Sequence, residues 1–305
     1  MVKGMPADST RGRAVLMLAA SAVLWSMGGL LIKSVDWNPF AIAGTRSAIA
    51  ALVVAALLRR PRFAWSLPQI GGAVAYSATV ILFVLANKIT TAANAIVLQY
   101  ACPVYVALLG VPLLKEKISL RAGIMMCIAL AGIVLFFFDR LTPGGFRGNI
   151  LALVSGVTMA FMVIFLRMQK HGPPTESILL GNILTVLICA PHMSAPMPSP
   201  PDMVSLVLLG VFQLGISYML YSRAIQHVPA LDAILIPVIE PVLNPVWVFL
   251  AMGERPGPWA IAGGLVILLS ITIFSVMEAR DIRLTGDARR FRADARRSDV
   301  TDARK

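Results

Sequence analysis

Residues 230–252 read ALDAILIPVIEPVLNPVWVFLAM, and residues 92–114 read AANAIVLQYACPVYVALLGVPLL. Each stretch is predominantly apolar over 23 residues, and about 20 such residues are enough for a helix to cross the hydrocarbon core of a bilayer. The two stretches therefore predict membrane-spanning helices, and the rest of the chain extends the same pattern.

The composition of the whole chain favours a membrane protein. Of the 305 residues, 58% are hydrophobic and 14% are charged, and the mean hydropathy is +0.79. Soluble globular chains are about 45–50% apolar with glycine included and about 25% charged. Because a soluble domain has too little interior to hide so much apolar surface, the composition argues against a soluble enzyme, and it excludes a disordered chain.

Ten apolar runs of suitable length follow one another along the chain. Turn and cap residues separate them, and the predicted spans are residues 14–33, 40–58, 67–87, 92–114, 120–138, 148–167, 177–192, 203–223, 230–252 and 258–278. The predicted fold class is an all-α membrane protein with ten transmembrane helices. These spans leave no room for a separate soluble domain.

The Lys and Arg residues between the spans predict the orientation. With the N-terminus inside, the inner segments carry twelve cations and the outer loops carry five, and nine more lie in the tail, residues 279–305. By the positive-inside rule, both termini are therefore cytoplasmic. The tail favours attraction to anionic lipid over nucleic acid, because acids are interspersed among its cations and Phe291 is its only aromatic residue.

The chain also shows signs of a duplication. A shift of 138 residues sets Ala86–Ile133 on Ala224–Ile271 without a gap and matches Pro103 with Pro241. Each half would hold five helices, and an odd number makes the second half enter the membrane from the opposite face, as a 5+5 inverted repeat. The predicted domains are a first repeat, 13–140, a second repeat, 147–278, and the basic cytoplasmic tail, 279–305.

Several residues at fixed places in the spans carry a resemblance to a known family. They are the pair Trp25-Ser26 with Lys33 in the first span, Arg46 in the second, Pro103 and Pro241 in the fourth and ninth, and the endings Leu114-Lys115-Glu116-Lys117 and Met252-Gly253-Glu254-Arg255. In this order and spacing, residues 13–278 resemble the EamA type of the drug/metabolite transporter superfamily. Two positions depart from the family pattern, since Lys115 stands where glycine is usual and Met159 where an aromatic residue is usual.

The resemblance implies a function. It implies a secondary transporter of the cell inner membrane that moves small organic metabolites by alternating access, with amino acids or related compounds as the expected substrates. A carrier of cationic or quaternary-amine compounds that uses Glu240 is the alternative, and a membrane-embedded enzyme is a remote one. The expected partners are a small-molecule substrate and the lipid bilayer, without nucleic acid, and the oligomeric state stays open.

Two charges fall deep inside predicted spans, Glu240 in the ninth and Arg46 in the second. A charge at that depth is costly unless it faces a cavity or a partner. Glu240 could therefore bind a cation or an ammonium group, carry a proton, or form a structural ion pair with Arg46. Arg46 could instead hold the carboxylate of a substrate.

Further polar and aromatic side chains complete the predicted substrate site. Asn244 follows Glu240 by four residues and so shares its helix face. The predicted substrate-binding residues are Trp25, Tyr76, Gln99, Tyr218, Glu240 and Asn244. Tyr and Trp near span ends also form interfacial belts, which is the alternative for the aromatic members.

Prolines and two glutamates stand at characteristic places in the spans. Proline loosens a helix because it lacks an N–H and clashes with the preceding turn. The predicted hinge residues are Pro103, Pro237, Pro241 and Pro245, with a static kink as the alternative. Glu116 and Glu254 each precede a span and are predicted to cap the N-terminus of the helix that follows.

The sequence carries no signature of catalysis. It contains no Walker A motif, no Gly-x-Ser-x-Gly and no His-Glu-x-x-His, and its three histidines, His171, His192 and His227, lack metal-ligand spacing. We therefore expect no catalytic residue, no metal site and no cofactor.

Overall fold

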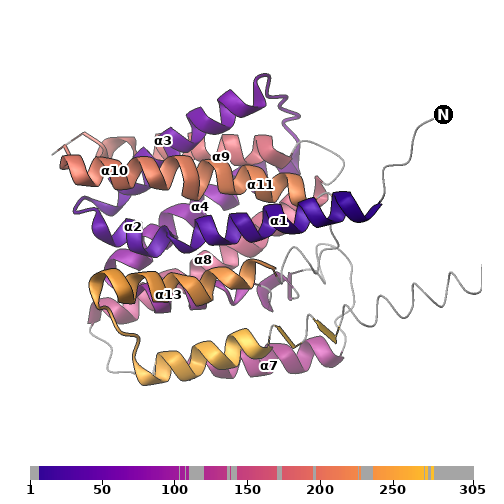
Figure 1. Ribbon diagram of the computed structural model, residues 1–305, viewed down its shortest axis with the longest axis vertical. Coiled ribbons are helices and arrows are strands. Elements are labelled where there is room, and N and C mark those ends of the chain that lie inside the picture. Colours follow the sequence, from indigo (N-terminus) through magenta and orange to yellow (C-terminus); the bar gives the residue numbers. More distant parts are fainter. Residues whose placement is uncertain are drawn as a thin grey trace, which may run out of the picture.

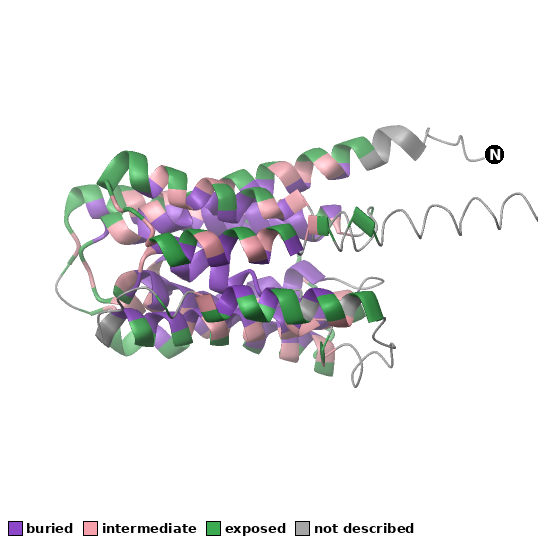
Figure 2. Cartoon of the chain, turned by 90° about the horizontal axis from the view of Figure 1, so that it is seen from below, coloured by how far each residue is buried: buried purple, intermediate pink, exposed green. Residues whose placement is uncertain are grey.

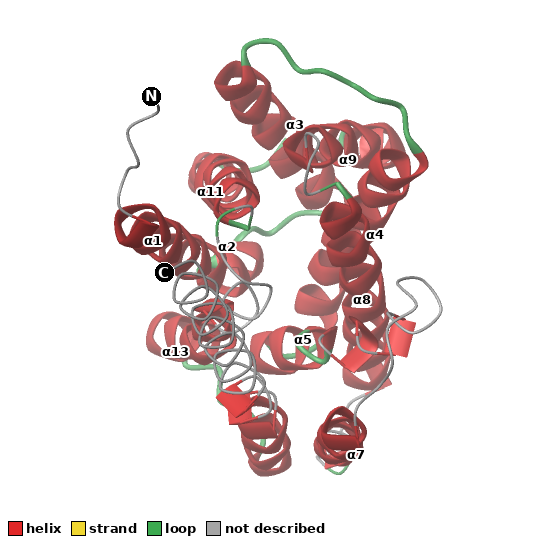
Figure 3. Ribbon diagram, turned by 90° about the vertical axis from the view of Figure 1, so that its right-hand side faces the viewer, coloured by secondary structure: helices red, strands yellow, loops and turns green. Residues whose placement is uncertain are grey.

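The structure, a computed structural model, describes most of the chain. The described residues are 7–102, 104–106, 108–109, 120–135, 138, 143–169, 174–194, 197–225, 227, 236–270, 272–273 and 276–277. Throughout these ranges the chain is predominantly helical and contains no β-strand (Figure 3). Pro103, Glu116 and the tail 279–305, about which the sequence makes predictions, lie outside the described residues.

The helices run roughly side by side in one bundle (Figure 1). The first part of the chain forms α1 (Ala7–Ser26), α2 (Gly28–Ser34), α3 (Pro39–Leu58), α4 (Leu67–Ile89), α5 (Ala92–Gln99) and α7 (Leu120–Leu135). The second part forms α8 (Pro143–Met168), α9 (Pro174–Cys189), the turn η1 (Ala190–His192), α10 (Pro200–Leu208), η2 (Leu209–Ile216), α11 (Ser217–Ala224), η3 (Ile236–Val238) and α13 (Ile239–Met252). A last helix covers Pro258–Ser270.

Each predicted span coincides with an apolar helix. Six helices are long and apolar enough to cross a membrane: Gly12–Ser34, Pro39–Leu58, Leu67–Ile89, Gly145–Met168, Pro174–His192 and Pro200–Ala224. In the other predicted spans, the described residues form shorter apolar helices, namely α5 (Ala92–Gln99), α7 (Leu120–Leu135), α13 (Ile239–Met252) and the helix Pro258–Ser270. The chain is therefore a multi-pass helical membrane protein, as the sequence predicts.

The arrangement of buried and exposed residues is typical of a protein surrounded by lipid. Large apolar side chains face outward, among them Leu16, Leu52 and Leu120, which are 70%, 72% and 82% exposed. Polar side chains, by contrast, lie inside, and Figure 2 shows the buried residues turned toward the middle of the bundle. Exposing so large an apolar surface to water is unfavourable, whereas exposing it to the hydrocarbon of a bilayer is favourable.

Helix α4 packs against α8 and α9. It is the most buried of the helices that are long enough to cross a membrane. Of the residues in its most apolar stretch, 67% are buried, against 44% for α3. Small residues allow these close approaches, because a Cβ at Gly71 would lie 2.7 Å from the Phe165 ring. At the edge of the bundle, α7 packs against the last helix, Pro258–Ser270 (Figures 1 and 3).

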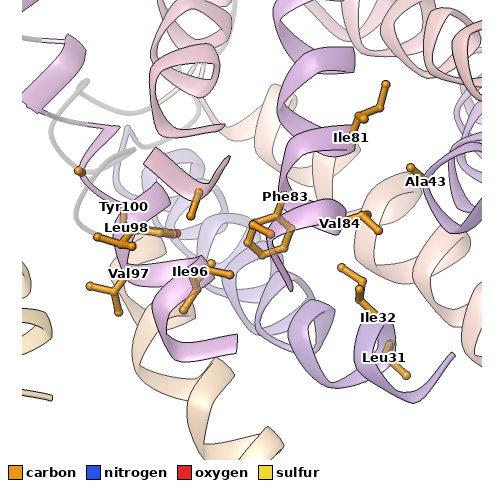
Figure 4. Close-up of a cluster of buried hydrophobic side chains, with 14 of the residues drawn as sticks. Leu31, Ile32, Ala43, Ile81, Phe83, Val84, Ile96, Val97, Leu98 and Tyr100 are labelled. Atoms are coloured by element: carbon orange, nitrogen blue, oxygen red, sulfur yellow. The ribbon is translucent and has the colours of Figure 1, made fainter. Parts of the chain in front are cut away.

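Two apolar clusters fill the interior. One gathers side chains of α2, α4 and α5, including Ile32, Phe83 and Ile96 (Figure 4). The other gathers aromatic residues of α1, α4 and α11, including Trp25 and Tyr218. Phe83 of the first cluster and Trp25 and Tyr218 of the second line one cavity, which holds the candidate site.

The first and the eighth predicted spans change their helical geometry within the described residues. The first breaks at Met27, between α1 and α2, where Gly28 and Gly29 follow. The eighth changes from the α-helix α10 to the π-helix η2 and back to α11. Irregular backbone at membrane depth occurs where neighbouring protein or a cavity satisfies the freed polar groups, and it commonly lines transport routes.

Candidate functional site

Arg46 lies on α3 and is almost completely buried, with 1% of its surface exposed. Its Nη1 donates to Gln213 Oε1 at 3.1 Å, and its Nη2 donates to the Val80 carbonyl oxygen at 2.9 Å. Its Nε is buried and has no hydrogen-bond partner. The guanidinium is thus held by two neutral acceptors, and its positive charge is not neutralised by them.

Glu240 lies in the first turn of α13 and is also buried, with 6% exposed. Its Oε2 is 2.7 Å from the hydroxyl of Tyr100, which also lies 2.8 Å from the Pro237 carbonyl oxygen. The hydroxyl has one proton to donate and so serves one of the two acceptors at a time. The positive end of the α13 dipole favours an anion at this place.

Arg46 and Glu240 line the same cavity without forming an ion pair with each other. The cavity measures about 30 Å³, and a water molecule needs about 10–15 Å³ of such space, so it has room for about two waters. The lining residues are Trp25, Arg46, Thr79, Val80, Phe83, Gln99, Met159, Gln213, Leu214, Tyr218 and Glu240. Two side chains of opposite charge thus line one small, mostly apolar cavity inside the membrane.

Aromatic rings of α1, α4 and α11 form one wall of this chamber. The Trp25 ring lies 4.8 Å from that of Tyr218 and 5.1 Å from that of Tyr221, centroid to centroid. Tyr76 meets Tyr218 edge-on at 5.0 Å and donates to Asn182 Oδ1 at 3.2 Å. Of the aromatic residues predicted for the site, Trp25 and Tyr218 line the cavity, and Tyr76 supports Tyr218 from behind.

The two amide side chains predicted for the site take different places. Gln99 lines the cavity, and its Nε2 donates to Ser155 Oγ at 2.6 Å. Asn244 is fully buried on α13 and lies against Gly29, where a Cβ would have no room. Asn244 does not line the cavity, and its contact with Gly29 places its amide at the break in the first span. Neither polar atom of this amide has a hydrogen-bond partner.

The ninth span is not one continuous α-helix in its described part. A short 3-10 turn covers Ile236–Val238, and the α-helix α13 begins at Ile239. Pro237 therefore precedes the α-helix, Pro241 sits in its first turn, where the absent N–H leaves no bond unmade, and only Pro245 lies inside it. The sequence predicts three prolines along one helix, whereas the structure places a change of helix type between the first two.

The side-chain partners of the two buried charges were not predicted from the sequence. Gln213 and Tyr100 are the partners of the two buried charges, and each lies more than a hundred positions from its partner along the chain. A polar or aromatic residue inside an apolar span was the available signal, but such residues are frequent in this chain. The contacts depend on packing between distant helices, which no local pattern reports.

The prediction that Glu254 caps the helix that follows it is wrong, because Glu254 caps a different helix. Its Oε1 accepts from the Ala92 backbone N–H at 2.7 Å, and its Oε2 pairs with Lys33 Nζ at 2.8 Å. Lys33 Nζ also donates to the Thr90 carbonyl oxygen at 2.9 Å. Glu254 thus caps the start of α5, in the other half of the chain, instead of the helix that follows it, because the fold brings that N-terminus within reach.

We expect Glu254→Ala to lower the stability of the protein by about 1–2 kcal/mol, since it removes a helix cap and a partly exposed ion pair. Glu254→Gln keeps an oxygen for the Ala92 N–H and loses only the charge, so its loss is smaller. The measurement is the thermal unfolding midpoint of the purified protein in detergent. Arg255→Gln, a charge change in the same loop, is the matched control. Equal midpoints for wild type and both Glu254 variants would contradict the capping role.

Comparison with known proteins agrees with this architecture. A model of the EamA-like transporter family matches the chain twice, over residues 12–138 and 146–276. A crystal structure with 19% sequence identity superimposes with a TM-score of 0.65, covering 88% of this chain and 98% of that one, and so shares the fold.

Related sequences point to the same class of protein. Solute carrier family 35 member G1 of Mus musculus is 24% identical over 290 residues, which is 86% of this chain and 77% of the relative. An uncharacterized transporter of Archaeoglobus fulgidus is 26% identical, over 86% of this chain and 95% of its own length. The biotin transporter of Escherichia coli K12 is 25% identical, over 90% and 97%. These relatives are transporters rather than enzymes, and the chain belongs to the EamA-like transporter family.

Proposed function

We propose that this protein is a secondary transporter of the inner membrane that moves amino acids or closely related metabolites by alternating access. Its membership of the EamA-like family supports transport of small molecules. The amino-acid assignment rests on one observation: a cavity at membrane depth is lined by Arg46 and Glu240, which do not pair with each other.

An α-amino acid carries the two charges that this pair can bind. Arginine binds carboxylates with charge-assisted, planar hydrogen bonds, and a buried glutamate attracts an ammonium group. Two buried charges left without ionic partners are costly in a bilayer, and a zwitterion of matching polarity would offset that cost. The apolar walls at Val80, Phe83 and Leu214 would receive its side chain.

Alternating access would provide the space and the path. The cavity of about 30 Å³ is too small for an amino acid, so binding needs its helices to separate. The break at Met27 and the helix change before Ile239 offer places for such movement, with Pro237, Pro241, Pro245 and Pro103 as the proposed hinge residues.

The double match of the family model supports ten spans in two five-helix repeats, 13–140 and 147–278, of inverted topology. The proposed termini are cytoplasmic, with 279–305 as a basic tail.

A carrier of cationic compounds is the second candidate. Glu240 would bind the cation, and Trp25 and Tyr218 could contribute cation–π contacts from the same chamber. Arg46 disfavours this candidate, because a cation without a carboxylate leaves the guanidinium without an ionic partner and should therefore bind more weakly than an amino acid. The biotin transporter relative suggests a third test compound, since biotin carries a carboxylate and no ammonium group.

Uptake into liposomes reconstituted with the purified protein tests the proposal. Radiolabelled amino acids, a quaternary amine and biotin are assayed side by side against protein-free liposomes. We expect saturable uptake of amino acids and little of the other two. Uptake of the quaternary amine alone would favour the second candidate, and absence of amino-acid uptake would overturn the proposal.

A further inference from the structure

Gln213 lies within a π-helix, η2 (Leu209–Ile216), that interrupts the eighth span. Such wide turns are rare, shift side chains out of the α-helical register, and are often found at functional sites. Gln213 is 5% exposed and lines the cavity beside Arg46. The irregular turn thus carries a polar side chain to the same chamber as the two charges.

Two glycines of η2 bring this turn close to α3. A Cβ at Gly210 would lie 2.5 Å from the Ile49 Cβ and 2.8 Å from the Arg46 carbonyl oxygen, and one at Gly215 would lie 2.9 Å from the Val53 side chain. Any larger residue would push the two helices apart. The close approach sets the distance between Gln213 Oε1 and Arg46 Nη1, which is 3.1 Å.

The contacts of Arg46 use two of the five N–H groups of its guanidinium, and its Nε–H is among those left without an acceptor. Gln213 holds Nη1 and the Val80 carbonyl oxygen holds Nη2, while Nε has no acceptor. Because the guanidinium is planar and rigid, two fixed nitrogens determine the direction of the third. The Nε1 of Trp25, on the same cavity, is likewise buried without an acceptor. A carboxylate is the group that would accept from such N–H donors.

Gln213 also touches the break in the first span. A Cβ at Gly28 would lie 3.0 Å from the Gln213 Nε2, so this amide abuts the backbone next to Met27. One side chain therefore meets Arg46 through its oxygen and the interrupted helix through its nitrogen. A shift of the backbone at this break would displace the Gln213 amide, and the amide would in turn shift its hydrogen bond to Arg46.

We propose that Gln213 is a positioning residue that holds Arg46 so that its Nε–H is available to the carboxylate of the substrate, and that it thereby makes the site selective for carboxylate-bearing substrates. Gln213 acts in this way only if the protein transports amino acids as proposed above. The residue would not itself need to touch the carboxylate. Its loss should therefore weaken binding of substrates with a carboxylate and spare those without one.

The test compares Gln213→Leu and Gln213→Glu with wild type in liposome uptake of leucine and of 3-methylbutylamine, which is leucine without its carboxylate. Gln213→Leu has no acceptor for Nη1, and we expect its KM for leucine to rise about tenfold or more, with the KM for the amine unchanged. Gln213→Glu keeps the shape but neutralises Arg46 with a carboxylate of its own, so its leucine KM should rise further. Phe212→Leu, an exposed neighbour on η2, is the matched control and should resemble wild type.

The outcomes separate the two proposals. A leucine KM that is unchanged in both Gln213 variants, or a rise that is equal for leucine and the amine, overturns the positioning role while the transport function stands. A wild-type protein that moves no amino acid overturns the proposed function and the positioning role together. If Gln213→Leu fails to fold, as judged by size-exclusion chromatography, Gln213→Met takes its place, because methionine keeps the length of the side chain and lacks the oxygen that accepts from Nη1.

Discussion

We expect Arg46→Met to lower kcat/KM for amino-acid uptake about 100-fold or more, because it removes the guanidinium that would bind the substrate carboxylate. Hydrogen bonds to a charged group contribute about 1.5–3 kcal/mol each, and a carboxylate held by a guanidinium loses at least one of them together with the charge. Methionine fills a similar volume, so the apolar packing around α3 is largely kept. Uptake of leucine into liposomes, with protein folding checked by thermal unfolding, measures the effect.

Arg46→Lys is the informative companion of this variant. Lysine restores the positive charge as a single point, but it lacks the planar, rigid arrangement with which the guanidinium serves Gln213 and Val80 and directs Nε–H at the same time. We expect it to recover only a small part of the leucine uptake. Full recovery would show that charge alone is needed, and unchanged uptake by Arg46→Met would leave Arg46 a purely structural role.

Glu240→Gln is expected to reduce uptake of leucine and of 3-methylbutylamine alike, by about 30-fold or more, because both compounds present an ammonium group to this side chain. The amide oxygen of glutamine can still accept from the Tyr100 hydroxyl, so the local fold is retained. If Glu240 also carries a proton during transport, the wild-type rate varies with pH and the variant rate does not. An unchanged rate with unchanged pH dependence would exclude Glu240 as substrate anchor and as coupling site.

The two charge variants together give a pattern that a general loss of stability does not produce. Arg46→Met should impair leucine and spare the amine, whereas Glu240→Gln should impair both. Tyr100→Phe serves as the control for Glu240, because it removes the hydroxyl at 2.7 Å and leaves the carboxylate in place. We expect it to change uptake only a few-fold, the size of one neutral hydrogen bond.

The sequence by itself predicted the class of fold and the two charges that matter. Apolar runs of membrane length are a local property, so each predicted span coincides with an apolar helix. A charge inside such a run stands out for the same reason, and Arg46 and Glu240 could be named before any contact was known. Trp25, Gln99 and Tyr218, predicted on the same grounds, line the cavity with them.

Only the tertiary structure decided how these residues are used. The sequence left open whether Glu240 forms an ion pair with Arg46 or serves a ligand or a proton. Packing instead brings each charge to a neutral side chain, Gln213 or Tyr100, which lies 167 or 140 positions away along the chain. The π-helix that carries Gln213 and the reach of Glu254 to α5 depend likewise on neighbouring helices. Hydrophobic pattern determines which segments enter the membrane, because lipid acts on each segment separately. The partners inside are determined by close packing between segments, because that alone sets which polar groups can meet.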